Sequence, residues 1–184
     1  MDLAPRLHTA RTRIRLAEAA DAPELLRYRV ANRMHLTPWE PLRDEAYWRL
    51  EHCTHAIVEG IELARLDRGY PFLVFDPDER EILATFTFSN VVRGAFQACH
   101  IGFGVAACMQ GQGIMHEALQ AGLEWAFGEL GLHRVMANHM PRNERSARLL
   151  ARLGFEHEAY AKRYLKIAGV WEDHVLTARV RPDD

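Results

Sequence analysis

The sequence contains no long apolar run. No stretch of its 184 residues approaches the roughly 18 consecutive apolar residues that a membrane-spanning helix needs. Residues 1–6 also lack the apolar segment of a secretory signal. We therefore expect a cytoplasmic protein with no membrane partner.

Cysteine is scarce, and basic residues are not in excess. The three cysteines, Cys53, Cys99 and Cys108, show no CxxC spacing, which indicates buried thiols in a reducing compartment. The ten histidines form no HExxH or Cys/His zinc pattern, so we expect no bound metal. With 23 Lys and Arg against 25 Asp and Glu, the chain has no overall basic field, and we expect no direct nucleic-acid binding.

The length and the apolar content are typical of one globular domain. A content of 48% hydrophobic residues over 184 positions suffices for a single core, which we place at about residues 11–178. The sequence shows no repeat and no linker, so we expect one domain over residues 1–184.

Hydrophobic periodicity predicts the elements of this domain. Strands are expected at 11–16, 72–75, 81–88, 98–105, 134–138, 155–165 and 170–178. Helices are expected at 21–33, 44–66, 115–130 and 143–153, and Gly60 could interrupt the second of them. Residues 1–10 are expected to be a loose terminus, and the two prolines of 37–41 indicate a loop. This order predicts an α/β (α+β) fold, with a mixed sheet and helices on its faces.

Gly111 and Gly113 lie in the turn between a predicted strand and a predicted helix. The first turn of a helix has backbone N–H groups without intrahelical partners, and these groups carry partial positive charge. Glycine lets such a backbone approach a ligand closely and adopt positive φ. The segment 110–115 is therefore typical of an anion-binding loop suited to a pyrophosphate. An ordinary tight turn beside a core helix is the alternative.

Two common phosphate loops do not fit this segment. A Walker loop needs Lys-Ser or Lys-Thr after its glycines, and a Rossmann fingerprint needs a third glycine where His116 stands. The segment Gln110-Gly111-Gln112-Gly113-Ile114-Met115 resembles the Q/RxxGxG/A loop of GNAT-family acetyltransferases, which grips the pyrophosphate of acetyl-CoA. Met115 stands where that family usually has Gly or Ala. The resemblance implies the GNAT acyl-CoA N-acyltransferase fold, a central twisted mixed sheet with helices on both faces.

A second segment, 143–155, is similar to the NxxSxxLLxxLGF motif of the same family. The resemblance implies that Asn143 contacts the pantetheine arm of the cofactor and that Ser146 protonates the departing thiolate. Because the two residues are one helical turn apart, both side chains can face one ligand. Asn143 is also a good helix cap, and capping is compatible with ligand contact.

The resemblance extends over about residues 11–178 to ribosomal-protein alanine N-acetyltransferases of the RimJ type. It implies that the protein transfers the acetyl group of acetyl-CoA to the α-amine of an N-terminal alanine on a small-subunit ribosomal protein. A monomer or a homodimer is expected. The segments that carry this similarity are 39–45, 75–79, 88–94, 136–141 and 171–177.

The resemblance also assigns site residues. The backbone N–H of Val105 would face the thioester oxygen. Trp39, Glu40 and Asn90 would line the acceptor groove, and Glu40 and Ser146 would be the catalytic residues. The residues expected to hold acetyl-CoA are Phe103, Gly104, Val105, Gln110, Gly111, Gln112, Gly113, Ile114, Met115, Asn143 and Ser146.

The general base stays open between Glu40, His100, Glu117 and Asp173. Glu40 could equally bind the incoming ammonium. Four arginines recur on one predicted helix, and one or two of them could make bidentate contacts with the 3′-phosphate of CoA, the alternative being a solvated basic face. These are Arg142, Arg145, Arg148 and Arg152.

Two other functions are compatible with the same fold. One is a GNAT acetyltransferase of a small amine, such as a polyamine. The other is a non-catalytic ribosome-binding factor, against which the intact loop 110–113, Asn143 and Ser146 argue.

Overall fold

The computed structural model describes residues 5–182, and its strands form one sheet of eight strands in the order β1-β2-β3-β4-β5-β6-β8-β7. The strands are β1 (Arg6–His8), β2 (Arg13–Leu16), β3 (Gly69–Phe75), β4 (Ile82–Val92), β5 (Ala98–Val105), β6 (Arg134–His139), β7 (Glu156–Ile167) and β8 (Val170–Val180). The α-helices of the described part are α1 (Ala22–Ala31), α2 (Arg33–Leu36), α3 (Leu50–Arg65), α4 (Ile114–Phe127) and α5 (Glu144–Arg152).

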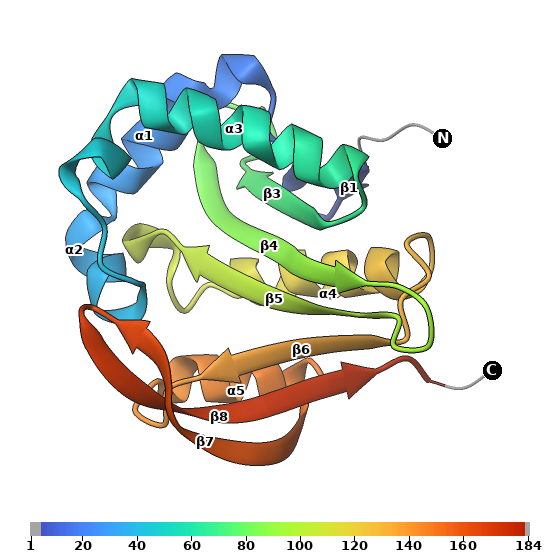
Figure 1. The fold of residues 1–184 in the computed structure, drawn as a ribbon. Coiled ribbons are helices and arrows are strands. Elements are labelled where there is room, and N and C mark those ends of the chain that lie inside the picture. Colours follow the sequence, from blue (N-terminus) through green and yellow to red (C-terminus); the bar gives the residue numbers. More distant parts are fainter. Residues whose placement is uncertain (1–4, 183–184) are drawn as a thin grey trace.

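The sheet opens in its middle. Every neighbouring pair of strands is antiparallel except β5 and β6, which are parallel. These two strands pair only from Ala98 with Arg134 to His100 with Met136. Beyond that point β5 stays with β4 and β6 stays with β8, so the two halves of the sheet diverge (Figure 1).

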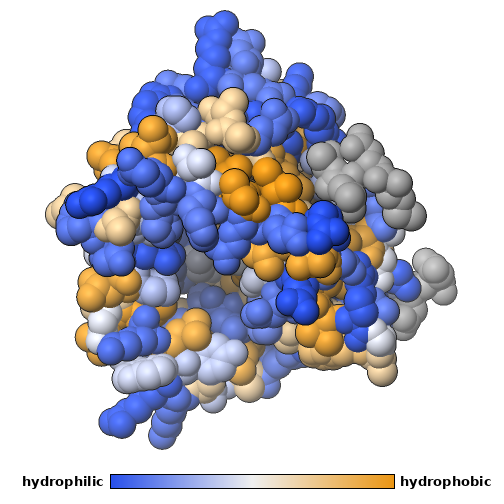
Figure 2. Space-filling view, turned by 45° about the horizontal axis from the view of Figure 1, so that its top comes forward, coloured by the Kyte–Doolittle hydropathy of each residue, from blue (hydrophilic) through white to orange (hydrophobic). Residues whose placement is uncertain are grey.

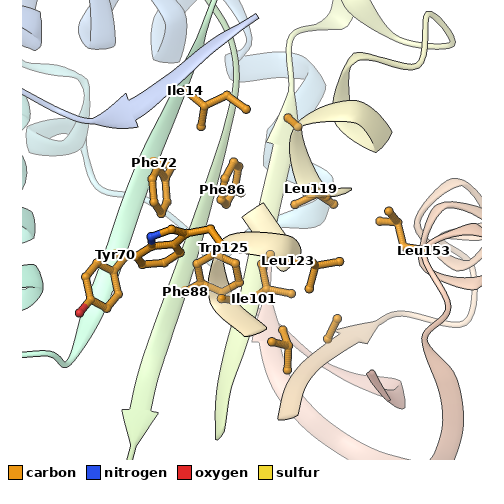
Figure 3. Packing of buried hydrophobic residues seen from close by; sticks show 14 of the residues in the cluster. Ile14, Tyr70, Phe72, Phe86, Phe88, Ile101, Leu119, Leu123, Trp125 and Leu153 are labelled. Atoms are coloured by element: carbon orange, nitrogen blue, oxygen red, sulfur yellow. The ribbon is translucent and has the colours of Figure 1, made fainter. Parts of the chain in front are cut away.

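Helices cover both faces of the sheet: α1 and α3 lie on one face, and α4 and α5 on the other (Figure 1). Because successive side chains of a strand point to opposite faces, β3 contributes to the core on both faces of the sheet. Phe72 and Val74 point into the cluster beneath α4, whereas Leu73 and Phe75 point into the cluster beneath α1 and α3. Figure 3 shows the larger cluster, in which Trp125 of α4 meets the aromatic rings of β3 and β4. The expected mixed sheet with helices on both faces is confirmed.

The N-terminal region differs from its prediction as a loose terminus. Residues 6–8 form β1, which pairs with β2 through Leu7 and Ile14, while residues 1–4 lie outside the described part. A strand of three residues is too short to produce a periodic signal in the sequence, so only its pairing with β2 reveals it.

The expected helix over 44–66 is shorter and is not interrupted at Gly60. Its first residues form a separate 3-10 turn, Glu45–Trp48, capped by the side chain of Asp44, and Arg49 is extended at φ −117°. Helix α3 then runs from Leu50 through Gly60. A Cβ added at Gly60 would lie 2.7 Å from Cγ of Pro71, so this glycine allows α3 to approach β3 closely.

The predicted loop over 37–41 contains a 3-10 turn, Thr37–Trp39, that follows α2 directly. Pro38 fits this turn because its fixed φ suits the first residues of a helix, where no N–H is needed. Glu40 then returns to an extended conformation. The carbonyl of Glu40 accepts a hydrogen bond from Ala168 N of the β7–β8 turn (2.9 Å), which ties this segment to the other half of the sheet.

Gly122 provides a test of how α4 packs on β4. A Cβ added there would lie 2.9 Å from two atoms of the Phe86 ring, which is only 1% exposed and has no room to move. We expect Gly122→Val to lower the free energy of unfolding by about 1–3 kcal/mol, measured by urea denaturation. Glu124→Val, on the exposed side of the same helix, is the control and should change it by about 0.5 kcal/mol or less. Equal unfolding midpoints for both variants would contradict this packing.

Candidate active site

A cavity of about 690 Å³ opens where β5 and β6 diverge. Its walls come from both halves of the sheet, from α1 and the segment 36–48, from the start of α5, and from the β7–β8 hairpin. The space-filling view shows a hollowed face with hydrophilic side chains along much of its rim (Figure 2). The fold therefore brings segments from the whole length of the chain around one cavity.

The backbone of β5 supplies hydrogen-bond donors at the split. Gly104 pairs with Thr85, and Ala106 N donates to Leu83 O (2.9 Å). The backbone groups of Gly104 and Ala106 therefore form hydrogen bonds with β4. In an antiparallel pair the intervening residues point their N–H and C=O groups the other way. The N–H groups of Phe103 and Val105 therefore face the gap toward β6. Phe103 and Gly104 line the cavity wall, whereas Val105 adjoins it.

The loop 110–115 has the conformation expected for an anion site. Gly111 and Gly113 have φ of 74° and 82°, and a Cβ added at Gly111 would meet no atom within 4 Å. The backbone N–H of Glu117 donates to Gly113 O (3.0 Å). Within residues 5–182, it is the first N–H of α4 that donates to a backbone carbonyl preceding the helix. The preceding amides are those that a helix leaves without intrahelical partners. Backbone, open space and helix N-terminus together fit a pyrophosphate.

The side chains of this loop have separate tasks. Ile114 and Met115 are 3% and 6% exposed and belong to the core beneath α4. Only their backbone can serve a ligand, so Met115 does not reduce the space over the loop. The Gln110 side chain instead contacts His35 Nε2 (3.0 Å) and Arg145, and the Gln112 amide donates to Cys108 O (2.7 Å).

Arg11 holds the loop from the far end of the chain, a contact that the sequence does not indicate. Its guanidinium donates to Gln112 O (2.9 Å) and pairs with Glu117 (2.8 Å). Two further hydrogen bonds join Arg11 to the same carboxylate, one of them from its backbone N. The loop is thereby fixed between the start of β2 and the first turn of α4.

Asn143 and Ser146 both line the cavity from the start of α5. The Asn143 Oδ1 accepts a hydrogen bond from Ser146 N (3.2 Å), which is the capping arrangement expected from the sequence. This bond uses neither the Asn143 amide N–H groups nor the Ser146 hydroxyl. Capping thus orients the two side chains and leaves their donors for a ligand.

Trp39 and Glu40, which were expected in the acceptor groove, also line the cavity. The Arg142 guanidinium lies 5.1 Å from the centre of the Trp39 ring. Burial raises the pKa of Glu40, while the nearby Arg43 (3.7 Å) and Arg29 partly oppose this effect. The carboxylate is therefore a stronger base than one in free solution.

Asn90 lies outside the cavity. It is exposed, has φ of 53°, and falls where the pairing of β4 with β5 shifts its register. Its neighbour Ser89 lines the wall in its place. The register shift turns the strand by one residue, and sequence alternation alone could not locate that shift.

Of the four candidate bases, Glu40 alone lies on the cavity wall. Glu117 is held by Arg11, and Asp173 is engaged inside the β7–β8 hairpin. Burial lowers the pKa of His100, whose Nδ1 is buried without a hydrogen-bond partner in the described chain. The geometry therefore separates Glu40 from the other three candidates by its place on the cavity wall.

The four arginines near α5 separate in space. Arg142 pairs with Glu172 (2.9 Å) and Arg148 with Glu144 (3.1 Å), which is the behaviour of a solvated face. Arg145 contacts the side chain of Gln110 at the glycine loop. Arg145 is thus the member of the set that lies beside the expected phosphate site.

Tyr28 is a site residue that sequence reasoning missed. It is 5% exposed, lines the cavity, and donates its hydroxyl hydrogen bond to Gly104 O (3.3 Å). Burial raises the pKa of its hydroxyl. Tyr28 follows Leu25 by three residues in a helix, and this spacing in the sequence indicates only a core position.

Within residues 5–182, no group of three or more His, Cys, Asp or Glu side chains is placed to hold a metal ion. No helix in that range is both long enough and apolar enough to cross a membrane.

Comparison with known proteins identifies the family. Residues 11–156 match the Acetyltransferase (GNAT) domain. The chain is 47% identical over 178 residues to the ribosomal protein uS5-alanine N-acetyltransferase of Escherichia coli (strain K12), covering 97% of this chain and 92% of that protein. The chain belongs to the GNAT acetyltransferase family, and it is an acetyl-CoA-dependent N-acetyltransferase as its motifs predicted.

Solved structures agree with this assignment. The crystal structure of the ribosomal-protein-S5-alanine acetyltransferase from Vibrio fischeri superimposes with a TM-score of 0.93 at 38% identity, covering 97% of this chain and 98% of that chain. Mycobacterium smegmatis RimJ in complex with CoA-disulfide gives 0.88 at 33% identity, covering 96% and 86%. The GNAT fold expected from the sequence is confirmed.

Gly113 tests the placement of the cofactor at the loop. Gly113→Val adds a branched side chain at φ 82° and obstructs the approach of a pyrophosphate to the backbone, so we expect acetyl-CoA affinity to fall about tenfold or more. Calorimetric titration measures this directly. Gly131→Val is the control, because Gly131 also has positive φ (70°) but lies in open space after α4. Unchanged affinity in a folded Gly113→Val protein would contradict the loop assignment.

Proposed function

We propose that this enzyme acetylates the α-amine of an N-terminal alanine, and that its acceptor is a ribosomal protein. The relatives from Escherichia coli and Vibrio fischeri support this acceptor class, because both are named for that reaction and the similarity spans almost the whole of each chain. The structural observation that carries the proposal is that Ser146 and Glu40 line one shared cavity.

The cavity walls divide the reaction between them. Acetyl-CoA supplies an activated thioester, so the new bond joins the acceptor nitrogen to the acetyl carbon while the bond from that carbon to sulfur breaks. Val105 N–H donates to the oxygen on which negative charge develops. Glu40 takes the proton that the amine loses, and Ser146 gives a proton to the thiolate sulfur.

The raised pKa of Glu40 matches this role. Burial makes the carboxylate more basic, and the positive charges of Arg43 and Arg29 oppose part of that rise in its pKa. The acceptor needs little help, since an α-amine has a pKa of roughly 7.7–8.0. A single half-buried carboxylate is therefore an adequate base for this substrate.

The charge of the cavity argues against a polyamine as the acceptor. Its wall carries four cationic side chains, Arg29, Arg33, Arg43 and Lys166, against the one carboxylate of Glu40. A polycation would meet net repulsion there. The intact loop and the paired Asn143 and Ser146 likewise disfavour a non-catalytic factor, because such a factor needs none of them.

The acceptor group can be tested with one peptide that has an N-terminal alanine and an internal lysine. We expect acetylation at the α-amine alone, because its neutral fraction at neutral pH exceeds that of a lysine by roughly 300-fold. Fragmentation mass spectrometry locates the acetyl group. Acetyl on the lysine, or turnover of a free polyamine with no peptide acetylated, would favour the small-amine enzyme instead.

Glu40→Gln tests the proposed base. The amide keeps the shape of the side chain but cannot take a proton, so we expect kcat/KM to fall by about 100-fold or more with acetyl-CoA affinity unchanged. Glu45→Gln is the matched control, since Glu45 lies nearby with its side chain 77% exposed and pairs with Arg33. Equal activity of both variants would remove Glu40 from the chemistry.

A further inference from the structure

The acceptor cavity is basic in a chain that is not. The net charge of the sequence is −2, yet cationic side chains outnumber carboxylates four to one on the cavity wall. The one carboxylate, that of Glu40, is already assigned to the chemistry. The remaining charge of the wall therefore calls for a negative group on the molecule that enters.

Two of these cations enclose an aromatic ring. The guanidinium carbons of Arg29 and Arg43 lie 4.1 Å and 4.5 Å from the centre of the Tyr47 ring. Stacking on tyrosine orients a guanidinium while leaving N–H donors at its edge free to bind. We call these three residues the Arg29–Tyr47–Arg43 stack.

Arg29 forms no salt bridge within the described chain. Its Nη1 contacts only neutral groups: Tyr47 O (3.5 Å), His52 Nδ1 (3.2 Å) and Cys53 Sγ (3.4 Å). No carboxylate of the described chain lies within 4.0 Å of it, although the residue is half-buried. A charge withdrawn from water without a partner is costly, so a site that retains one is poised to bind an anion.

The charges of the other three cations on the cavity wall are also incompletely neutralised. Arg43 approaches Glu40 only to 3.7 Å, and Arg33 pairs with Glu45, which does not line the cavity. Lys166 faces the cavity from β7, and no carboxylate of residues 5–182 lies within 4.0 Å of it. Positive charge therefore borders the cavity on two sides.

Resting on the function proposed above, we propose that the enzyme selects acceptors with an acidic side chain a few residues after the N-terminal alanine. The Arg29–Tyr47–Arg43 stack binds that carboxylate, with Lys166 adding to the field. An extended peptide advances about 3.3 Å per residue, so only the first few residues can occupy the cavity. Guanidinium–carboxylate contacts are directional and charge-assisted, which makes the stack a determinant of specificity.

The pyrophosphate of the cofactor does not supply the negative group that would neutralise these cations. The glycine loop 110–115, where a pyrophosphate fits, is not on the wall of this cavity. The acetyl-CoA affinity of an Arg43 variant distinguishes an acceptor carboxylate from a phosphate of the cofactor as the anion that the stack binds. The affinity stays unchanged if the stack binds the acceptor, and it falls if the stack binds the cofactor.

The test is a series of peptides that begin with alanine and carry one glutamate at each of positions 2 to 6, each matched by a glutamine peptide. We expect at least one position at which glutamate raises kcat/KM about tenfold, mainly through a lower KM. Arg43→Gln should reduce that ratio toward one. Arg29→Gln should do the same if it folds, and Arg80→Gln, on the exposed turn before β4, should leave the ratio unchanged.

A charge exchange makes the test sharper. Arg43→Glu should prefer lysine over glutamate at the selected position, reversing the order of the wild-type enzyme. The inference is overturned if glutamate and glutamine peptides react equally at all five positions, or if the preference survives in Arg29→Gln, Arg43→Gln and Lys166→Gln alike. The proposed function fails separately, if no alanine peptide of any composition is acetylated while acetyl-CoA still binds.

Discussion

The active site depends on a loss of pairing inside the sheet. Strands β5 and β6 share a parallel ladder for three residue pairs, and after His100 and Met136 each strand stays with its antiparallel neighbour. Parallel neighbours are free to separate at their C-terminal ends because no tight turn joins them there. The separation exposes the unpaired N–H groups of Phe103 and Val105 and leaves room for the cavity. If β5 and β6 stayed paired, these N–H groups would donate hydrogen bonds to β6 and would not be available to a ligand.

Two segments of the candidate site are each held by contacts from distant parts of the chain. Arg11 fixes the glycine loop through Gln112 and Glu117. The β7–β8 turn holds the loop that carries Glu40 through a backbone hydrogen bond. Because these restraints are part of the fold, the glycine loop and Glu40 are positioned before any ligand enters, which is how an enzyme limits the entropy lost in a reaction. The charge of the cavity wall also comes from distant parts of the chain, since α1, the 37–48 segment and β7 each bring cations to it.

Local patterns predicted most of the elements but not their irregularities. The apolar run of β3 and the helical period of α4 were visible because both elements bury apolar side chains in the core. The three residues of β1, the extended Arg49 before α3 and the register shift at Asn90 were not, because pairing partners far along the chain decide them. Gly60 shows the same limit: its role is close approach to Pro71, which a helix pattern cannot contain.

The sequence by itself determined the family, the glycine loop and the cap of α5, because the backbone conformation at Gly111 and Gly113 and the hydrogen bond that Ser146 N donates to the Asn143 side chain are local. Tertiary structure decided which of the candidate carboxylates lines the cavity. Glu40, Glu117 and Asp173 are equivalent as letters, and only packing places the first on the cavity wall and ties the others to partners elsewhere. The physical reason is that basicity and access depend on burial and on neighbouring charges, and both come from residues far apart in the chain.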